Sequence, residues 1–286
     1  QETLKTFGVS VSVSDISQGP SVTRFELQPE VGVRVNKIVS LADDLKLALA
    51  ATDIRIEAPI PGKSAVGIEV PNKEASSVGF RELIEDNAFK KAESKISFAV
   101  GKDIAGNVVV TDIAKMPHLL IAGATGSGKS VFLNQMILTL ATMYSPAELE
   151  LWLCDFKGSE FGKFLSVKGS DYIIPHIKAC LCTADGDFAA SLFDALETEG
   201  KRRYNLLQKP ELHLDELKYF PEGEPIPPFQ DGGKDWNRYW RKKATATGNN
   251  LYLKNCLPRI LVIVDEFQNI FQNAEDESKD ILVHAA

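Results

Sequence analysis

The chain has 286 residues, of which 44% are hydrophobic and 25% charged, and its formal net charge is −7 at pH 7. This composition is that of an ordinary globular protein, and the length suffices for two domains with sizeable cores. The acidic balance excludes a generally basic nucleic-acid-binding protein, so any contact with nucleic acid must use a local basic surface.

No apolar stretch approaches the roughly 20 residues of a membrane-spanning helix. We therefore expect this segment to make no membrane contact and to lie in the cytoplasm. The chain begins with Gln1 rather than Met. From this we expect a segment of a longer protein, which could carry a membrane anchor upstream. Four cysteines, at positions 154, 180, 182 and 256, fit no zinc spacing. Cys154 and Cys180 stand in apolar surroundings and are expected to be small core residues, as suits a reducing compartment.

The chain up to residue 72 predicts a small α+β domain. Short alternating or β-branched runs indicate strands, and a leucine pattern indicates one helix between them. The expected strands are 9–13, 22–26, 32–35, 54–56 and 66–70, and the expected helix is 39–51. A connecting segment follows over 73–97, with a short helix over 80–87.

From residue 98 to residue 286 the pattern changes to alternating strands and helices, which indicates an α/β domain. We expect a hairpin of 96–100 with 108–111, a helix over 131–143, a strand over 149–154 and an amphipathic helix over 187–207. Phe188, Leu192 and Leu196 share one face of this last helix. Residues 209–250 are polar and rich in Pro and Gly, and we interpret them as an insertion.

Between the apolar run 119–122, which is expected to form a strand, and the helix over 131–143 stands a complete G-x-x-x-x-G-K-[ST] phosphate-binding loop. Its glycines allow a tight turn and bring backbone N–H groups against phosphate oxygens, and the start of the next helix favours an anion. Lys129 can reach the outer phosphates, and the Ser130 hydroxyl can hold Mg²⁺. The residues assigned to the nucleotide are Gly123, Ala124, Thr125, Gly126, Ser127, Gly128, Lys129, Ser130 and Val131.

A second signal lies at 260–264, a continuous aliphatic run typical of a strand buried on both faces. It ends in Asp265 and Glu266, at the end of a strand where α/β sheets bind ligands. We assign Asp265 to Mg²⁺ through the water shell of the ion. We assign Glu266 to orienting and deprotonating the attacking water, so that Glu266 and Lys129 are the catalytic residues.

Asp155 ends the strand over 149–154, and two interpretations stay open for it: contact with the nucleotide, or a capping or turn role. The segment 236–243 interleaves aromatic and basic residues, which suits nucleic acid, a partner interface, or a helix whose tryptophans enter the core. The basic run 201–203 suits the end of a helix. His118 and His176 each adjoin a proline and are expected to be structural.

With these features placed, nearly the whole chain resembles the motor of the FtsK/SpoIIIE family of DNA translocases. The likeness includes a series of segments in the N-terminal domain, from Gly19-Pro20 to Pro71-Asn72, that generic P-loop proteins lack. The matching segments are 19–26, 32–38, 53–63, 66–72, 117–123, 155–157 with Glu160, 175–176, 257–258 and 265–267.

The resemblance implies a RecA-like P-loop NTPase core of α/β class with a smaller N-terminal α+β domain. It implies a ring of identical subunits, usually hexameric, that uses ATP and Mg²⁺ to translocate double-stranded DNA of a chromosome or mobile element. The N-terminal domain would form a second tier of the ring. Phe156 departs from the proline of the family, and 209–250 is longer than its equivalent. The chain ends before the strand expected to carry a polar nucleotide sensor, and no arginine finger or DNA-reading winged helix is identifiable.

Two other classes of function remain open on the sequence. One is a related ring ATPase that moves proteins in a secretion or conjugation system. The other is a nucleotide-regulated binding module with little hydrolysis. The N-terminal series disfavours the first, and Glu266 disfavours the second.

Overall fold

The computed structural model describes residues 2–92, 96–116, 118–124, 126–165, 173–183, 185–209, 213–220 and 233–269. The chain forms two compact units, Gln1–Leu140 and Ala141–Ala286. The division falls within helix α6 (Lys129–Met143), so that each unit is taken by itself below. The predicted domain boundaries at 72 and 98 stay a prediction.

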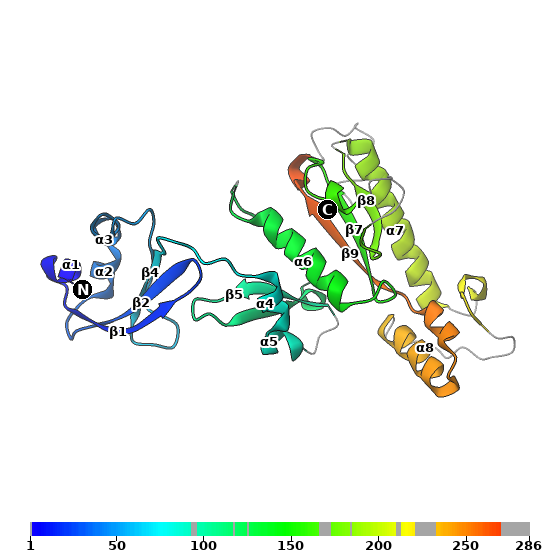
Figure 1. Ribbon diagram of the computed structural model, residues 1–286, viewed down its shortest axis with the longest axis horizontal. Helices are drawn as coiled ribbons and strands as arrows, with labels where there is room; N and C mark the ends of the chain where they lie inside the picture. Colours follow the sequence, from blue (N-terminus) through cyan, green and yellow to red (C-terminus); the bar gives the residue numbers. More distant parts are fainter. Residues whose placement is uncertain are drawn as a thin grey trace. The chain divides into compact units, whose positions relative to one another are not determined.

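An antiparallel sheet in the order β1-β2-β4-β3 forms the N-terminal part of the first unit (Figure 1). Alternate residues of its strands face helices and form one core, which includes Val11, Leu27, Val66 and Ile68. The elements are α1 (Glu2–Thr6), β1 (Val11–Gln18), β2 (Val22–Pro29), α2 (Val35–Val39), α3 (Ala42–Leu49), β3 (Arg55–Glu57) and β4 (Val66–Pro71).

The prediction of a strand over 32–35 is wrong, because helix α2 begins at Val35. Gly32 has a φ of +93°, a left-handed conformation that ends the extended run. Ile38 of α2 is fully buried in the core of this sheet. Burial of one helix face here outweighs the weak preference of β-branched residues for strands.

A hairpin of β5 (Ser97–Lys102) and β6 (Val108–Asp112) follows, as predicted. The short helices α4 (Phe80–Glu85) and α5 (Asn87–Lys90) cover it. Their contact is a separate small core of Leu83, Phe89, Ala99 and Val108. The first unit therefore contains two hydrophobic clusters, one for the N-terminal sheet and one for the hairpin.

The second unit is built on a parallel sheet in the order β8-β7-β9, with α7 (Gly186–Gln208) packed against it (Figure 1). The strands are β7 (Leu149–Asp155), β8 (Ile177–Leu181) and β9 (Arg259–Asp265). Central β7 is almost entirely buried, which explains its apolar run over 151–154. This parallel sheet confirms the predicted α/β class.

The predicted apolar face of α7 is only partly buried. Leu192 packs against the core of the sheet, but Phe188 is 61% exposed, and Ala189 and Ala190 are buried instead. The side chain of Asp185 accepts hydrogen bonds from the backbone N–H groups of Asp187 and Phe188 and fixes where the helix begins. The two small alanines then let the helix approach the strands closely.

Part of the predicted insertion is a helix, α8 (Gly233–Thr247), followed by the 3₁₀ helix η5 (Asn250–Asn255). Trp236, Trp240 and Ala244 recur at every fourth residue and are buried against Tyr252. Of the three interpretations of 236–243, the helix with tryptophans in the core is confirmed. Shorter 3₁₀ turns are η1 (Ile113–Lys115), η2 (Gly162–Phe164), η4 (Leu214–Glu216) and η6 (Phe267–Asn269).

No helix in the described part of the chain is long and apolar enough to cross a membrane.

Candidate functional site

The phosphate-binding loop depends on glycines at positions where other residues would be strained. Gly126 has a φ of +81° and Gly128 a φ of +96°, both in the left-handed half of backbone space. Thr125 lies outside the described residues. The loop thus takes the backbone form that its sequence predicts.

Gly123 is required for a different reason, namely close approach. A Cβ atom at this position would lie 2.2 Å from Oγ of Ser127 and 3.2 Å from its Cβ. The N–H of Ser127 donates to the carbonyl of Ala124 over 3.0 Å and closes the turn. The two ends of the loop are therefore in contact, and a side chain at 123 would require the Ser127 side chain to shift.

Helix α6 begins at Lys129, directly after the loop, and has no acidic residue in its first turn. Its positive end therefore keeps its attraction for an anion. The helix is anchored on the hairpin: the amide of Gln135 donates to the carbonyl of Ala99 over 2.7 Å, and Phe132 packs edge-on against Phe98 with ring centroids 5.8 Å apart. Val131 points outward and is 71% exposed.

The strand predicted at 119–122 is not formed. Residues 118–124 have no regular secondary structure, and Leu120 is 92% exposed. A strand exists through hydrogen bonds to a neighbour, and none of the described strands pairs with this segment.

The carboxyl edge of the parallel sheet brings two acidic residues together. β7 and β9 run in register, with Asp155 opposite Asp265, and both side chains are buried. The N–H of Phe156 donates to the carbonyl of Asp265 over 3.4 Å. The predicted strand ending in Asp265 is confirmed, but among the described strands β9 is an outer one and is mostly half-buried. The central, buried strand is β7, which ends in Asp155.

Asp155 organises the turn after β7. Its carboxylate oxygens accept four backbone hydrogen bonds, at 2.6–3.1 Å, from the N–H groups of Lys157, Gly158, Glu160 and Phe161. Burial raises the pKa of this carboxyl, but the four hydrogen bonds outweigh burial and hold the pKa below its usual value. The turn role is therefore the one that the structure supports, and nucleotide contact by Asp155 stays a prediction.

Glu266 has an unusual backbone for a non-glycine residue, with a φ of +53°. This left-handed step turns the chain away at the end of β9. Its carbonyl accepts from the N–H of Asn269 over 2.9 Å, and the side-chain amide of Gln268 donates to its carboxylate. The Glu266 side chain is half-buried beside the edge, compatible with contact to a water molecule.

The loop and the acidic edge belong to the two different units, and each is described here by itself. That Lys129, Ser130, Asp265 and Glu266 surround one nucleotide stays a prediction.

The structure also tests the predictions for the histidines and for the basic run 201–203. His176 is buried and its Nε2 donates to the carbonyl of Tyr144 over 2.5 Å, so its structural role is confirmed. His118 is exposed. Arg202 and Arg203 do not close a helix, because α7 continues to Gln208. Both instead pair with Glu199, and the hydrogen bond from Arg202 is the main cause that lowers the pKa of Glu199 to about 2.

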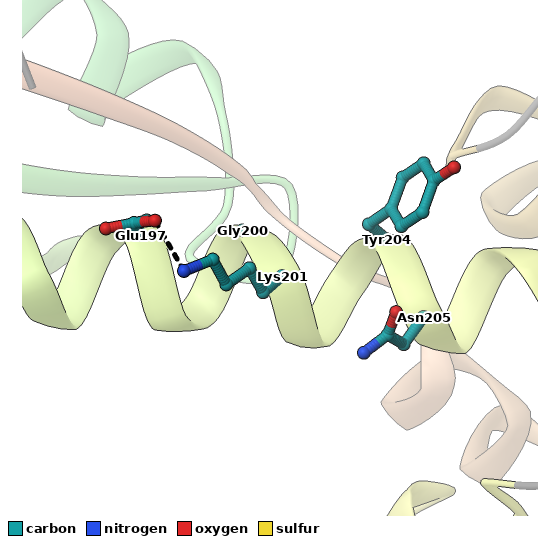
Figure 2. Close-up of a pocket in the computed structure, with 5 residues that line it drawn as sticks. All are labelled: Glu197, Gly200, Lys201, Tyr204 and Asn205. Carbon is teal, nitrogen blue, oxygen red and sulfur yellow. Dashed lines mark ion pairs between the residues drawn. The ribbon is translucent and has the colours of Figure 1, made fainter. Parts of the chain in front are cut away.

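A shallow hollow lies along α7, lined by Glu197, Gly200, Lys201, Tyr204 and Asn205 (Figure 2). The Nζ of Lys201 lies 2.5 Å from the carboxylate of Glu197. None of the residues predicted to bind nucleotide lines this hollow.

Comparison with known proteins places the chain in a family. The sequence model of the FtsK/SpoIIIE family matches residues 80–286, and that of the FtsK alpha domain matches residues 1–72. The chain belongs to the FtsK/SpoIIIE family. This confirms the resemblance and, with the parallel sheet, the RecA-like α/β core accompanied by a smaller α+β domain.

Relatives in this family carry names of DNA translocases. The chain is 53% identical over 206 residues to DNA translocase FtsK of Clostridium tetani, covering 72% of this chain and 27% of the relative. It is 40% identical to DNA translocase FtsK of Caldanaerobacter subterraneus, covering 100% of this chain and 35% of the relative. It is 39% identical to DNA translocase SftA of Bacillus subtilis, covering 99% of this chain and 26% of the relative. The chain thus spans about a third or less of the length of these relatives.

Among solved structures, the chain is similar to the pCW3 conjugation coupling protein TcpA in a monomer form with ATPγS. The TM-score is 0.47 at 18% identity, covering 99% of this chain and 69% of that one. It is also similar to the cytoplasmic domain of the Type VII secretion ATPase EccC of Thermomonospora curvata. Here the TM-score is 0.45 at 26% identity, covering 66% and 19%.

The sequence did not predict the contact of Gln268 with Glu266 at the carboxyl edge of the sheet, and it left the role of Asp155 undecided. The turn role of Asp155, which was left undecided, has a local signal, because an aspartate at the start of a turn commonly accepts a hydrogen bond from the backbone N–H two residues on, here that of Lys157. The missed contact of Gln268 with Glu266 has no such signal, since it depends on the left-handed backbone of Glu266.

Proposed function

We propose that this chain is the motor part of an ATP-hydrolysing translocase that moves double-stranded DNA, working in the cytoplasm as a homo-oligomeric, hexameric ring. The observation that carries the proposal is the joint match of the FtsK/SpoIIIE family over 80–286 and of the FtsK alpha domain over 1–72. The printed names of the relatives, all DNA translocases, support the substrate. The alpha domain disfavours the secretion and conjugation alternative.

The described residues fit ATP with Mg²⁺. The loop has left-handed glycines at 126 and 128 and leads into a helix whose first turn has no acidic residue, which suits a phosphate group. Ser130 and Asp265 offer the hard oxygen ligands that Mg²⁺ prefers, Asp265 acting through water. When bound, ATP supplies the phosphoryl group that is transferred to water, and Mg²⁺ offsets charge on its outer phosphates.

In this proposal the chain contributes positioning and charge. Lys129 neutralises negative charge at the outer phosphates, and the backbone N–H groups of the loop hold them in place. Glu266 accepts a proton from the attacking water, for which its carboxylate must be ionised. Asp155 acts indirectly, because its four backbone hydrogen bonds fix the turn beside Asp265.

Contact with DNA is proposed to use phosphates rather than base edges. A motor that travels along any sequence cannot depend on base contacts, so affinity comes from lysine and arginine meeting phosphates. With a net charge of −7, such a surface has to be local or assembled from several subunits. Affinity should fall with salt at a log–log slope of about −0.9 per phosphate neutralised.

The test is ATP hydrolysis with random duplexes of several lengths at two salt concentrations, with Glu266→Gln as the control for contaminating activity. We expect stimulation that varies little between unrelated sequences and falls with salt. Hydrolysis per subunit should rise with protein concentration, because a ring site is completed by its neighbour, and light scattering should show a hexamer. Stimulation by a protein substrate and by no duplex would favour the secretion alternative. Full activity from a strict monomer would refute the ring.

A further inference from the structure

Three of the four cysteines lie together at the carboxyl edge of the parallel sheet, and none of them is among the residues assigned to the nucleotide. Cys154 is fully buried in β7. Cys180 lies near the end of the neighbouring β8 and pairs with Leu153 of β7. Cys182 follows directly after β8. The Sγ atoms of Cys180 and Cys182 are 3.5 Å apart, and both residues are half-buried.

Metal binding does not account for this cluster. Among the residues that the structure places, no group of three His, Cys, Asp or Glu side chains could share a metal ion. Two thiols in contact are, however, the arrangement needed for reversible oxidation. We propose that Cys180 and Cys182 form a redox-modification site that a peroxide converts to an intramolecular disulfide.

The reaction balances without further partners. The Cys182 thiolate attacks one peroxide oxygen, the O–O bond breaks, and the products are a sulfenic acid at Cys182 and one water molecule. The Cys180 sulfur then attacks Sγ of Cys182 and expels the second water as the S–S bond forms. In total the two thiols lose two protons and two electrons, and hydrogen peroxide is reduced to two molecules of water.

Cys182 is assigned as the attacking residue because the surroundings of Cys180 favour its thiol form. The sulfur of Cys180 donates to the carbonyl of Phe161 over 3.9 Å, and the contact between the two sulfurs raises the pKa of Cys180 and lowers that of Cys182. Burial nevertheless raises the pKa of both thiols, and the charge of Asp155 raises both further; the nearby Cys154 acts on Cys180 in the same direction. The reaction is therefore slow at neutral pH and speeds up about tenfold per pH unit while the thiolate is the minor form.

Closing the disulfide requires the backbone to move. Residues two apart in a strand are separated by about 6.6 Å between Cα atoms, at the upper end of the roughly 4.4–6.8 Å range of disulfides. The sulfurs must also approach from contact distance to about 2.05 Å. Cys182 lies beyond the last ladder residue of β8, so it is the residue free to shift. Cys182 also lies beside the turn that Asp155 holds, because a Cβ atom built on Gly158 would be 3.6 Å from the carbonyl oxygen of Cys182.

The test uses the whole chain, treated with equimolar hydrogen peroxide at pH 7, 8 and 9, alkylated and digested with trypsin. Cleavage after Lys178 and Lys201 places both cysteines in one peptide, 179–201, whereas Cys256 lies in 255–259. We expect the 179–201 peptide to lose two hydrogens, to resist alkylation, and to regain both thiols with a reductant. Cys180→Ser and Cys182→Ser should abolish this product, and the matched control Cys256→Ser should retain it.

A second probe needs no variant. Phenylarsine oxide bridges two adjacent thiols with loss of one water, and we expect one equivalent on peptide 179–201 and none on 255–259. Hydrogen exchange at the backbone amides of 157–161 should change in the oxidised protein. Separate sulfinic acids without a disulfide, or oxidation confined to Cys256, would overturn the proposal. Disulfide formation with unchanged exchange at 157–161 would overturn its coupling to the Asp155 turn. All these readouts are independent of ATP hydrolysis.

Discussion

Replacing Asp155 by asparagine tests the central structural claim about the acidic edge. One carboxylate oxygen accepts from Lys157 at 3.0 Å and Gly158 at 2.8 Å, and the other from Glu160 at 2.6 Å and Phe161 at 3.1 Å. Asparagine retains one acceptor oxygen, but its NH₂ group faces two backbone donors. Two hydrogen bonds to a charged group are therefore lost, each worth about 1.5–3 kcal/mol.

The expected loss in the free energy of unfolding is about 3–6 kcal/mol, a large share of the roughly 5–15 kcal/mol that stabilises a typical domain. The matched control is Asp185→Asn. Asp185 is exposed and accepts from the N–H groups of Asp187 and Phe188 at the start of α7. Asparagine caps helices as well as aspartate does, so this variant should change stability by less than about 0.5 kcal/mol.

The assay is urea unfolding at pH 7 followed by tryptophan fluorescence. All three tryptophans, at 152, 236 and 240, belong to the unit Ala141–Ala286, so the signal reports on the unit that contains Asp155. Because the pKa of Asp155 is lowered on folding, its contribution is complete above the unfolded pKa and disappears as the pH falls through the folded pKa. The gap between wild type and Asp155→Asn should be constant from pH 8 to pH 5 and shrink below about pH 4. Equal stability of Asp155→Asn and Asp185→Asn at pH 7 would refute a turn held by four hydrogen bonds to Asp155.

Four further predictions concern single substitutions. Lys129→Ala should abolish nucleotide binding or hydrolysis, measured with a fluorescent ATP analogue and by phosphate release, since it removes the charge opposite the outer phosphates. Glu266→Gln should keep nucleotide binding but lose turnover; near-normal turnover would disprove its role as base. Gly123→Ala should weaken nucleotide binding without unfolding the protein, because its Cβ would lie 2.2 Å from the serine oxygen of the loop; unchanged affinity would contradict this geometry. Trp236→Phe should destabilise by about 1 kcal/mol more than Trp240→Phe in circular-dichroism melts, because only the Trp236 indole donates to a backbone carbonyl, over 2.7 Å; equal losses would argue against it.

Local patterns predicted the parts of the site that depend on local physics. The glycines of the loop, the helix starting at Lys129 and the aliphatic strand ending in Asp265 each have their cause within a few neighbouring residues. A left-handed φ favours glycine, and a run of β-branched and aliphatic residues favours a strand. These features could therefore be read from the sequence alone.

The errors have long-range causes. The run 119–122 has the composition of a strand, yet a strand forms only where a neighbour offers hydrogen bonds. Val33 and Val35 are β-branched and favour a strand, but burial of Ile38 favours the helix that begins at Val35. The helix over 233–247 was only one of three interpretations of 236–243, because its overall hydropathy is low and its apolar stripe, which includes Trp236 and Trp240, is narrow. In each case tertiary contacts, which no window of sequence contains, decide the outcome.

The backbone of Glu266 links the fold to the proposed chemistry. A left-handed conformation costs an ordinary L-residue about 1–2 kcal/mol, and glycine or asparagine would relieve most of this strain. The turn after β9 by itself therefore favours one of those residues, not a glutamate with a φ of +53°. The strained backbone is held by the hydrogen bond between Asn269 N–H and the Glu266 carbonyl, and the carboxylate accepts from Gln268. Glu266 therefore has a carboxylate at a position where the backbone conformation favours another residue type, directly after a buried aspartate. The function of the side chain, and not the geometry of the turn, accounts for a glutamate at this position. This is the physical argument for Glu266 as the group that acts on water.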